Sequence, residues 1–296
     1  MAPQRRRGVV VEEYGEGYLA SVSDLMSGLI FIFVITLMVF ALQLAKEKAV
    51  HAQKTQELVA AKETRRHILE DIEQRLKTAG FVVEIIPEQG VLRLSEQGIR
   101  FPFAAIDPRS EDEPNVGKLA RVLAEVLPCY VANRDEHETD DVALATRPDY
   151  CTETLASPAD YRCDREKFPA RLETVLIEGH TDSTPVRAGT RLKTFGNSHD
   201  LDNRDLASMR AAGILAMMVK CEPDITRLLN TEELPVIGTS GYGGTRPVNK
   251  TAEPEENRRI DVRFLMEQPR ETAAAGTPTS SDPLPPRREV RERYQP

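Results

Sequence analysis

An uncharged run of 21 residues, from Leu25 to Ala45, sets the strongest limit on what this chain can fold into. As an α-helix with a rise of 1.5 Å per residue the run spans about 32 Å, which matches the hydrocarbon core of a bilayer. Asp24 stands directly before it and Lys46 directly after it. We therefore predict one transmembrane helix over residues 18–45, with a carboxylate near its N-terminal end.

Asp24 allows two interpretations. It can cap the membrane helix at the level of the lipid headgroups, or it can be a proton-carrying carboxylate that faces a partner protein or a watery path, because an ionised Asp in lipid is costly. Ser27 and Gly28 follow three and four positions later on the same helix face, where small residues let another helix approach closely. In the second interpretation, each proton that crosses the membrane releases roughly 2.3 kcal/mol per 100 mV.

Length and charge limit the rest of the chain. Its 296 residues leave room, beyond the anchor and the tails, for one domain of ordinary size with its own core. The net charge of −8 argues against nucleic-acid binding, because a phosphate-binding surface needs a basic patch.

Four cysteines, Cys129, Cys151, Cys163 and Cys221, all follow the apolar run. None forms a Cys-x-x-Cys pair, so we expect no metal site, and an even number of widely spaced cysteines suits an oxidising compartment. Four cysteines allow three pairings. Cys151 with Cys163 is the most local, and Cys129 would then pair with Cys221.

The flanking charges do not decide the orientation of the helix. Arg5–Arg7 precede it and favour a cytoplasmic N-terminus, but four lysines follow it, Lys46, Lys48, Lys54 and Lys62. The cysteines favour a short N-terminus inside and the main domain outside. A cleaved signal peptide is the alternative, with Val50 and Ala52 as small residues for cleavage, but the apolar run is longer than a signal core and begins beside an acid. We therefore predict an uncleaved anchor.

Residues 46–80 follow as a helical linker. They are rich in Lys, Glu, Gln and Ala without Pro, and Gly80 is a typical helix stop. Ile68, Ile72 and Leu76 form an apolar stripe at helical spacing, which can pair with a second copy of the chain. Residues 46–60 can equally be a solvated spacer.

Periodicity predicts an α+β domain over residues 81–267. Strands are expected at 81–86, 91–94, 172–178, 236–242 and 259–266, with a further extended stretch at 99–103 and a turn over 87–90. Helices are expected at 115–127 and 203–220, on one face of the sheet as in an α/β sandwich. Residues 129–170 are predicted to be a cysteine-bearing insertion, and the Pro-rich residues 268–296 a disordered tail.

Four motifs in this domain occur in a specific order: Glu178-Gly-His-Thr-Asp182, then Asn203 to Arg210 on a helix, then Gly241-Tyr-Gly with Pro247 beyond it, and finally Asn257-Arg-Arg-Ile260-Asp-Val. Together they resemble the OmpA-like peptidoglycan-binding domain over residues 81–266. The resemblance implies that Asp182 and Arg210 bind diaminopimelate of the cell-wall peptide, with Thr181, Asn203 and Arg258 in the same site.

The chemistry agrees with this resemblance. Diaminopimelate ends in an ammonium and a carboxylate, so Asp182 can take the ammonium and Arg210 can hold the carboxylate in a two-point, charge-assisted contact. Asn203 lies two helical turns before Arg210 and shares its face. Singly, such residues more often form an ordinary surface pair.

The chain departs from the family pattern in two places. Ala207 replaces the usual Ser, and the segment between Asp182 and Arg210 is long and carries Lys193, His199 and Asp200. His180 is interpreted as structural. With no nucleophile–base pairing, the chain is not expected to be an enzyme.

A single membrane helix that opens Asp24-Leu-Met-Ser, joined to an OmpA-like domain, is similar to the B subunits of proton-driven motors such as the flagellar stator subunit MotB. Three features favour the ZorB family, the MotB-like subunits of Zorya anti-phage defence systems. These are the Asp-Leu-Met segment with a small polar residue next, a spacer of about 35 residues and the cysteine-bearing insertion.

This resemblance implies a single-pass protein of the bacterial inner membrane with its main domain in the periplasm. Two copies of it would stand inside a ring of five MotA/ZorA-like subunits, bound to peptidoglycan outside and acting indirectly on cytoplasmic defence effectors. It implies no cofactor and a transported ion, H⁺ by family, carried by Asp24. A flagellar stator subunit and a passive wall tether are the alternatives.

Overall fold

The structure is a computed structural model. It describes residues 15–81, 83–94, 98–102, 105–134, 148–151, 164–186, 191–194, 197–249 and 253–269. The N-terminal residues 1–14, Cys163, most of the predicted insertion and the tail from residue 270 onward lie outside these ranges.

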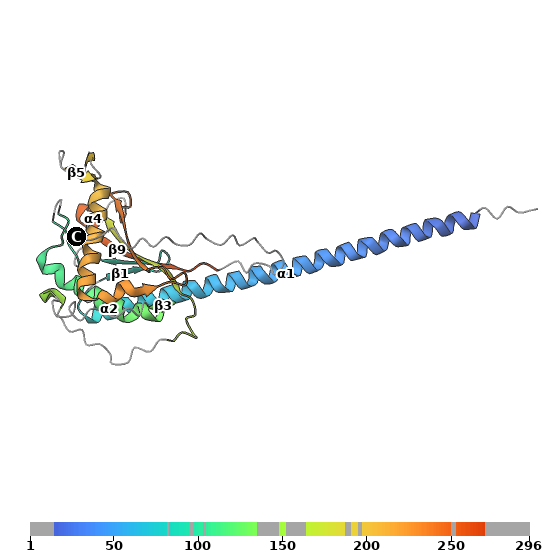
Figure 1. Cartoon of the computed structure of the whole chain (residues 1–296), viewed down its shortest axis with the longest axis horizontal. Helices are drawn as coiled ribbons and strands as arrows, with labels where there is room; N and C mark the ends of the chain where they lie inside the picture. The colour runs from blue at the N-terminus through green and yellow to red at the C-terminus, as the bar shows by residue number, and fades with distance from the viewer. Residues whose placement is uncertain are drawn as a thin grey trace, which may run out of the picture.

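One helix, α1 (Gly15–Thr78, 64 residues), contains both the predicted membrane span and the predicted linker. It projects from the domain as a rod (Figure 1), about 96 Å long at 1.5 Å per residue. Its apolar stretch is the one described helix that is long and apolar enough to cross a membrane, and none of that stretch is buried in the protein. The helix shows no break because Gly28 is its last glycine and it contains no proline.

Gly80 ends the helix as predicted, by a Schellman motif. Its φ of 73° lies in the left-handed region that favours glycine. Its N–H donates to the Lys77 carbonyl at 3.0 Å, and the Phe81 N–H donates to the Leu76 carbonyl at 2.8 Å. Phe81 and Leu76 are both buried, so the chain turns directly into the domain core.

The domain is built on a five-stranded sheet in the order β1-β2-β9-β4-β8. The strands are β1 (Val83–Ile86), β2 (Val91–Leu94), β4 (Leu172–His180), β8 (Ile237–Gly243) and β9 (Ile260–Met266). Strands β4 and β8 are parallel, and the other neighbours are antiparallel. The predicted hairpin of β1 and β2 around residues 87–90 is confirmed, whereas the described part of 99–103 contains no strand.

Helices α2 (Glu113–Val126) and α4 (Asn203–Cys221) and the last turns of α1 enclose the core with the sheet. The residues of β4 alternate, with Val175 and Ile177 facing this core. Ile68, Ile72 and Leu76 of α1 are fully buried in it, so the domain itself uses the stripe that was predicted to be free for a second copy. The expected fold class, an apolar N-terminal helix followed by a mixed α/β domain, is confirmed.

Smaller elements complete the domain and were not predicted. Two further sheets have two antiparallel strands each. One pairs β3 (Asn133–Arg134) with β7 (Leu228–Leu229), and the other pairs β5 (Arg191–Thr194) with β6 (Asn197–Asp200). The short helices are η1 (Ser110–Asp112), η2 (Leu127–Cys129), η3 (Asp149–Cys151), η4 (Pro223–Arg227) and α5 (Pro254–Asn257).

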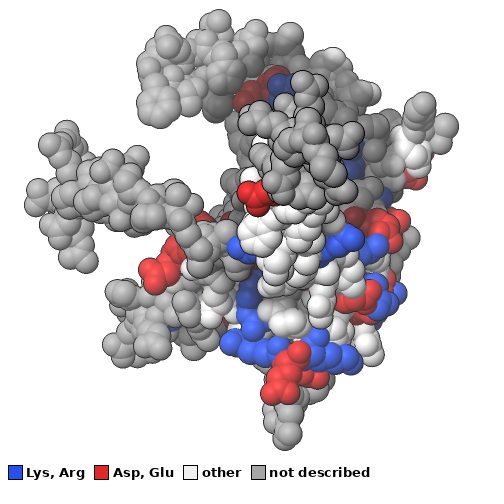
Figure 2. Space-filling view, turned by 90° about the vertical axis from the view of Figure 1, so that its right-hand side faces the viewer, with Lys and Arg blue, Asp and Glu red and all other residues white. Residues whose placement is uncertain are grey.

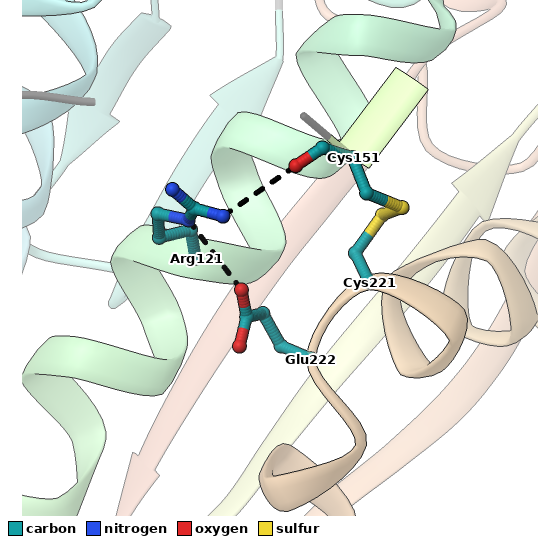
Figure 3. The surroundings of a disulfide bond; sticks show 4 residues. All are labelled: Arg121, Cys151, Cys221 and Glu222. Atoms are coloured by element: carbon teal, nitrogen blue, oxygen red, sulfur yellow. Dashed lines mark hydrogen bonds and ion pairs between the residues drawn. A yellow bond between two sulfur atoms is a disulfide. The ribbon is translucent and has the colours of Figure 1, made fainter. Parts of the chain in front are cut away.

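The predicted disulfide pairing is wrong. Cys151 bonds to Cys221 across 70 residues (Figure 3), which excludes both Cys151 with Cys163 and Cys129 with Cys221. Cys129 is also disulfide-bonded, and no described cysteine is a free thiol. Proximity in sequence was misleading because the fold, not the loop length, decides which cysteines meet.

Packing on α2 brings this pair together. Helix η3 lies so close to α2 that a Cβ on Gly117 would be 2.7 Å from the Tyr150 carbonyl oxygen. Arg121 of α2 donates to the Cys151 carbonyl at 3.4 Å and forms an ion pair with Glu222, directly after Cys221, at 3.4 Å (Figure 3). Arg121 therefore links the two chain segments that carry Cys151 and Cys221 to α2.

Strand β4 and helix α4 approach each other closely at Gly179. A Cβ at this position would overlap the backbone carbonyl of Ala207, which cannot move without shifting the helix. Glycine is therefore required at the end of β4 for the helix to lie against the sheet.

We predict that Gly179→Ala destabilises the chain by about 1–3 kcal/mol, the usual cost of forcing extra atoms into a packed core. Urea unfolding of the full chain in detergent, followed by circular dichroism, measures the effect. Gly213→Ala is the matched control, because a Cβ on that glycine of α4 meets no atom within 4 Å and alanine favours helix. Equal stability of the two variants would contradict the close contact.

Candidate functional site

All five residues predicted for the outer site, Thr181, Asp182, Asn203, Arg210 and Arg258, line one pocket. The wall of this pocket also includes Thr184, Pro185, Val186 and Leu206. The pocket lies where β4 ends and α4 begins, with Arg258 contributed by the turn between α5 and β9.

The end of β4 and the capped start of α4 place these residues at the pocket. Strand β4 ends at His180, so Thr181 and Asp182 emerge at its end. Asp202 caps α4 in a capping box: its carboxylate accepts from the N–H groups of Arg204 and Asp205, at 2.7 and 2.9 Å. This fixed start puts Asn203 and Arg210, seven residues apart, on the helix face toward the pocket.

Asp182 is already engaged in the pocket. Its carboxylate accepts from Arg258 Nη1 at 2.7 Å and from the Thr184 N–H at 2.8 Å. Burial raises the pKa of Asp182, but the bonds from Arg258 and Thr184 outweigh it and hold this pKa below its ordinary value. The second Arg258 nitrogen, Nη2, donates to the exposed Glu255 at 2.9 Å.

Asn203 and Thr181 shape the loop that carries Asp182. The Asn203 Nδ2 group donates to the backbone carbonyls of Asp182 and Thr184, at 3.2 and 3.0 Å. The Thr181 hydroxyl donates to the Asp182 carbonyl at 3.0 Å. In the structure these two side chains therefore hold the pocket wall in place.

Arg210 is buried, with 1% of its surface exposed. Its Nε donates to the Ala105 carbonyl at 2.8 Å and its Nη2 to the Pro102 carbonyl at 3.4 Å. Its guanidinium lies 4.7 Å from the centre of the Phe101 ring. Nη1 is buried and has no hydrogen-bond partner among the described residues.

The charge of the pocket is unbalanced. Burial, followed by the nearby Arg258, lowers the pKa of Arg210 to about 10, while Asp182 acts in the opposite direction; the group stays protonated at neutral pH. The pocket wall thus holds two guanidinium groups, those of Arg210 and Arg258, and one carboxylate, that of Asp182, which pairs with Arg258. Such a pocket can accept a ligand carboxylate together with a ligand ammonium.

Both ends of the long segment between Asp182 and Arg210 line the pocket, but Ala207, Lys193, His199 and Asp200 are not among its lining residues. Ala207 is fully buried against β4 at Gly179, so its missing hydroxyl takes nothing from the pocket. Lys193, His199 and Asp200 belong to the β5–β6 hairpin, in which Lys193 is paired with Ser198 and His199 with Leu192.

The opposite face of the sheet carries a second group of polar residues. Glu178, His180 and Asp261 are buried there and offer ligand atoms within 4.8 Å of one another. Both carboxylates already bind guanidinium groups: Glu178 binds Arg263 at 2.6 and 2.9 Å, and Asp261 binds Arg259 at 3.1 Å. Cationic neighbours oppose a further cation, so this group is better described as an ion-pair network than as a metal site.

His180, which was predicted to be structural, is buried with 1% of its surface exposed. Burial is the main cause that lowers its pKa to about 3, and the positive charges of Arg259, Arg246, Arg93 and Arg263 add to it. The ring is therefore neutral at physiological pH. It stacks on Tyr242, with 5.5 Å between ring centres.

Asp24, Ser27 and Gly28 lie on the exposed part of α1, on the rod that projects from the domain. The Ser27 hydroxyl donates to the Ser23 carbonyl at 2.8 Å, and a Cβ on Gly28 would meet nothing within 4 Å.

Figure 2 looks toward the domain along this rod, and acidic and basic side chains lie beside one another on the visible domain surface. The structure therefore keeps the two predicted sites apart.

No protein-family model and no curated protein matches this chain. Solved structures do resemble it. The periplasmic domain of MotB is 16% identical over 62% of this chain and 67% of that chain, with a TM-score of 0.36. A putative MotB like protein from Desulfovibrio vulgaris is 16% identical over 71% of this chain and 97% of that chain, with a TM-score of 0.40.

The OmpA-like domain of FopA1 from Francisella tularensis subsp. tularensis SCHU S4 is 9% identical over 63% of this chain and 82% of that chain, with a TM-score of 0.30.

We predict that Arg258→Met raises the pKa of Asp182, because burial then acts against fewer stabilising bonds. In the wild type, the lowered native pKa stabilises the fold above about pH 4, the ordinary pKa of an unfolded Asp. That stabilisation is lost as the pH falls through the native pKa. A carboxyl-carbon NMR titration of Asp182 measures the change.

Arg227→Met is the control for this titration, because Arg227 pairs with Asp224 instead, at 3.2 Å. It should leave the Asp182 titration unchanged. An unchanged Asp182 pKa in Arg258→Met would show that the Arg258 contact does not hold the carboxylate.

Proposed function

We propose that this chain is the wall-anchored, ion-conducting B subunit of a proton-driven inner-membrane motor that acts in anti-phage defence. One observation carries the proposal. A single unbroken helix joins a charge-free span that begins at Asp24 to a domain whose pocket collects Asp182, Arg210 and Arg258. A carboxylate at the membrane and a site for a zwitterionic ligand outside it are the two parts that such a subunit needs.

The outer ligand in this proposal is the diaminopimelate of the peptidoglycan stem peptide. Its ammonium pairs with the Asp182 carboxylate, and its carboxylate meets the free Nη1 of Arg210 and the nearby Arg258. Both contacts are charge-assisted and lie in a partly buried pocket, where such bonds are strong. Anchoring to the wall gives a motor the fixed point against which it turns.

The inner part of the proposal concerns Asp24. It takes up and releases H⁺ as a ring of MotA/ZorA-like subunits moves around two copies of α1. Ser27 and Gly28 allow a partner helix to approach this carboxylate closely. The short N-terminus is cytoplasmic and the domain is periplasmic, which fits the disulfide-bonded Cys151 and Cys221.

The short spacer supports a defence motor over a flagellar stator. Burial of α1 begins at Ala61, so residues 46–60 alone separate the membrane span from the domain, a rise of about 23 Å. In this proposal, the partner subunits pass the motion of their ring on to cytoplasmic defence effectors.

We predict that Arg210→Ala reduces retention of the full chain on purified peptidoglycan at least tenfold, because the buried donor to the ligand carboxylate is lost. Arg204→Ala is the control: it removes an exposed arginine from the first turn of the same helix. Retention equal to wild type in Arg210→Ala, with folding verified by circular dichroism, would contradict wall binding at this pocket.

We further predict that Asp24→Asn abolishes phage protection in cells that carry the whole gene neighbourhood, while membrane assembly stays intact. The amide cannot carry a proton, yet it is easier to place in lipid than a carboxylate. Plaque counts measure protection, and co-purification of the partner subunits measures assembly. Full protection by Asp24→Asn would reduce the chain to a passive wall tether. Loss of motility without any effect on phage would favour a flagellar stator.

A further inference from the structure

The buried guanidinium of Arg210 is held by a segment that the sequence motifs do not include. This segment lies between β2 and α2, more than a hundred residues before Arg210, and it contributes Phe101, Pro102 and Ala105. No ion pair joins Arg210 to a carboxylate among the described residues. Its positive charge is met there by two carbonyl dipoles and one aromatic face.

These contacts fix the guanidinium in three ways. The Ala105 carbonyl takes the Nε proton at 2.8 Å, and the Pro102 carbonyl takes a proton of Nη2 at 3.4 Å. The Phe101 ring, whose centre lies 4.7 Å from the Arg210 guanidinium carbon, limits movement of the guanidinium plane. Because the guanidinium is rigid and planar, holding Nε and Nη2 also sets the direction of Nη1.

Nη1 is then the donor left for a ligand. It is buried and has no partner in the part of the chain that the structure describes, while Arg210 as a whole lines the pocket beside Asp182. A free arginine side chain would lose rotamer freedom on binding, whereas a side chain that is fixed beforehand does not.

We propose that Phe101 is a positioning residue of the pocket: with the carbonyls of Pro102 and Ala105, it orients Arg210 so that Nη1 meets the ligand carboxylate. This inference rests on the wall-binding function proposed above. Phe101 itself does not line the pocket, and it acts only through Arg210.

Phe101→Leu tests the proposal, because leucine keeps an apolar side chain but removes the aromatic face. We expect about tenfold weaker retention of the full chain on purified peptidoglycan, in line with the strength of desolvated cation–π contacts. If this variant does not fold, Phe101→Met takes its place with the same expectation. Phe81→Leu is the matched control, since Phe81 is also buried but lies just after the end of α1 and makes no hydrogen bond or ring contact with Arg210 in the described part of the chain. This variant should retain wild-type binding.

The second readout is the Nε–H signal of Arg210 in arginine-labelled full chain in detergent. We expect slow solvent exchange of this proton in the wild type and in Phe81→Leu, and faster exchange in Phe101→Leu. A merely structural role for Phe101 would not predict this link between exchange and binding.

The outcomes separate this inference from the function on which it rests. Wild-type retention by Phe101→Leu, or reduced retention with an unchanged Nε–H signal, overturns the positioning role while Arg210→Ala still loses binding. If Arg210→Ala also binds peptidoglycan like wild type, the wall-binding function itself fails.

Discussion

Burial of the last turns of α1 in the domain core is the interaction on which the rest of this structure depends. Ile68, Leu69, Ile72 and Leu76 are fully buried, although the same helix is exposed along its apolar N-terminal part. Removing four large aliphatic side chains from water stabilises the domain by roughly 6–12 kcal/mol in total before the entropy cost of folding. The helix that leaves the bilayer is therefore part of the domain core, and the Schellman motif at Gly80 closes it.

This arrangement has a mechanical consequence. A helix without proline and without glycine after Gly28 offers no hinge between the apolar span and the core. In the proposed motor, a force on the membrane end would reach the pocket-bearing domain through one continuous element. A passive wall tether does not need this rigid connection and would work equally well with a flexible linker between the membrane span and the domain.

The pocket depends on a second constraint, the close contact of β4 with α4. Gly179 lets the helix approach the strand, and this approach brings Arg210 near Asp182, which follows the strand end. Arg258 then pairs with Asp182 at 2.7 Å, and this contact keeps the Asp182 carboxylate charged and oriented. The positive charge left over, on the buried Arg210, is the feature that a ligand carboxylate would satisfy in the proposed function.

Much of this could be predicted from local patterns. The apolar run, the stop at Gly80, the β1–β2 hairpin and the start of α4 at Asn203 all depend on residues close together in sequence. The ordered motifs also placed five residues that the fold brings into one pocket. The ion pair of Asp182 with Arg258 was not foreseen, because the motifs assign both residues to the ligand.

Long-range contacts were the ones that sequence reasoning missed. Cys151 meets Cys221 because η3 and the end of α4 both pack near α2, which no loop length reveals. The contacts of Phe101, Pro102 and Ala105 with Arg210 are likewise set by the tertiary fold, and two of them use backbone carbonyls that carry no sequence signal. The stripe of Ile68, Ile72 and Leu76 was recognised, but its partner is the domain itself.

The most direct test of the central claim is a calorimetric titration of the full chain, in detergent, with two soluble muropeptides. One carries diaminopimelate in its stem peptide and the other carries lysine, which lacks only the terminal carboxylate. The account predicts binding of the diaminopimelate peptide and at least tenfold weaker binding of the lysine peptide, because the buried Arg210 Nη1 would stay without an acceptor. Equal affinity for the two peptides would contradict it.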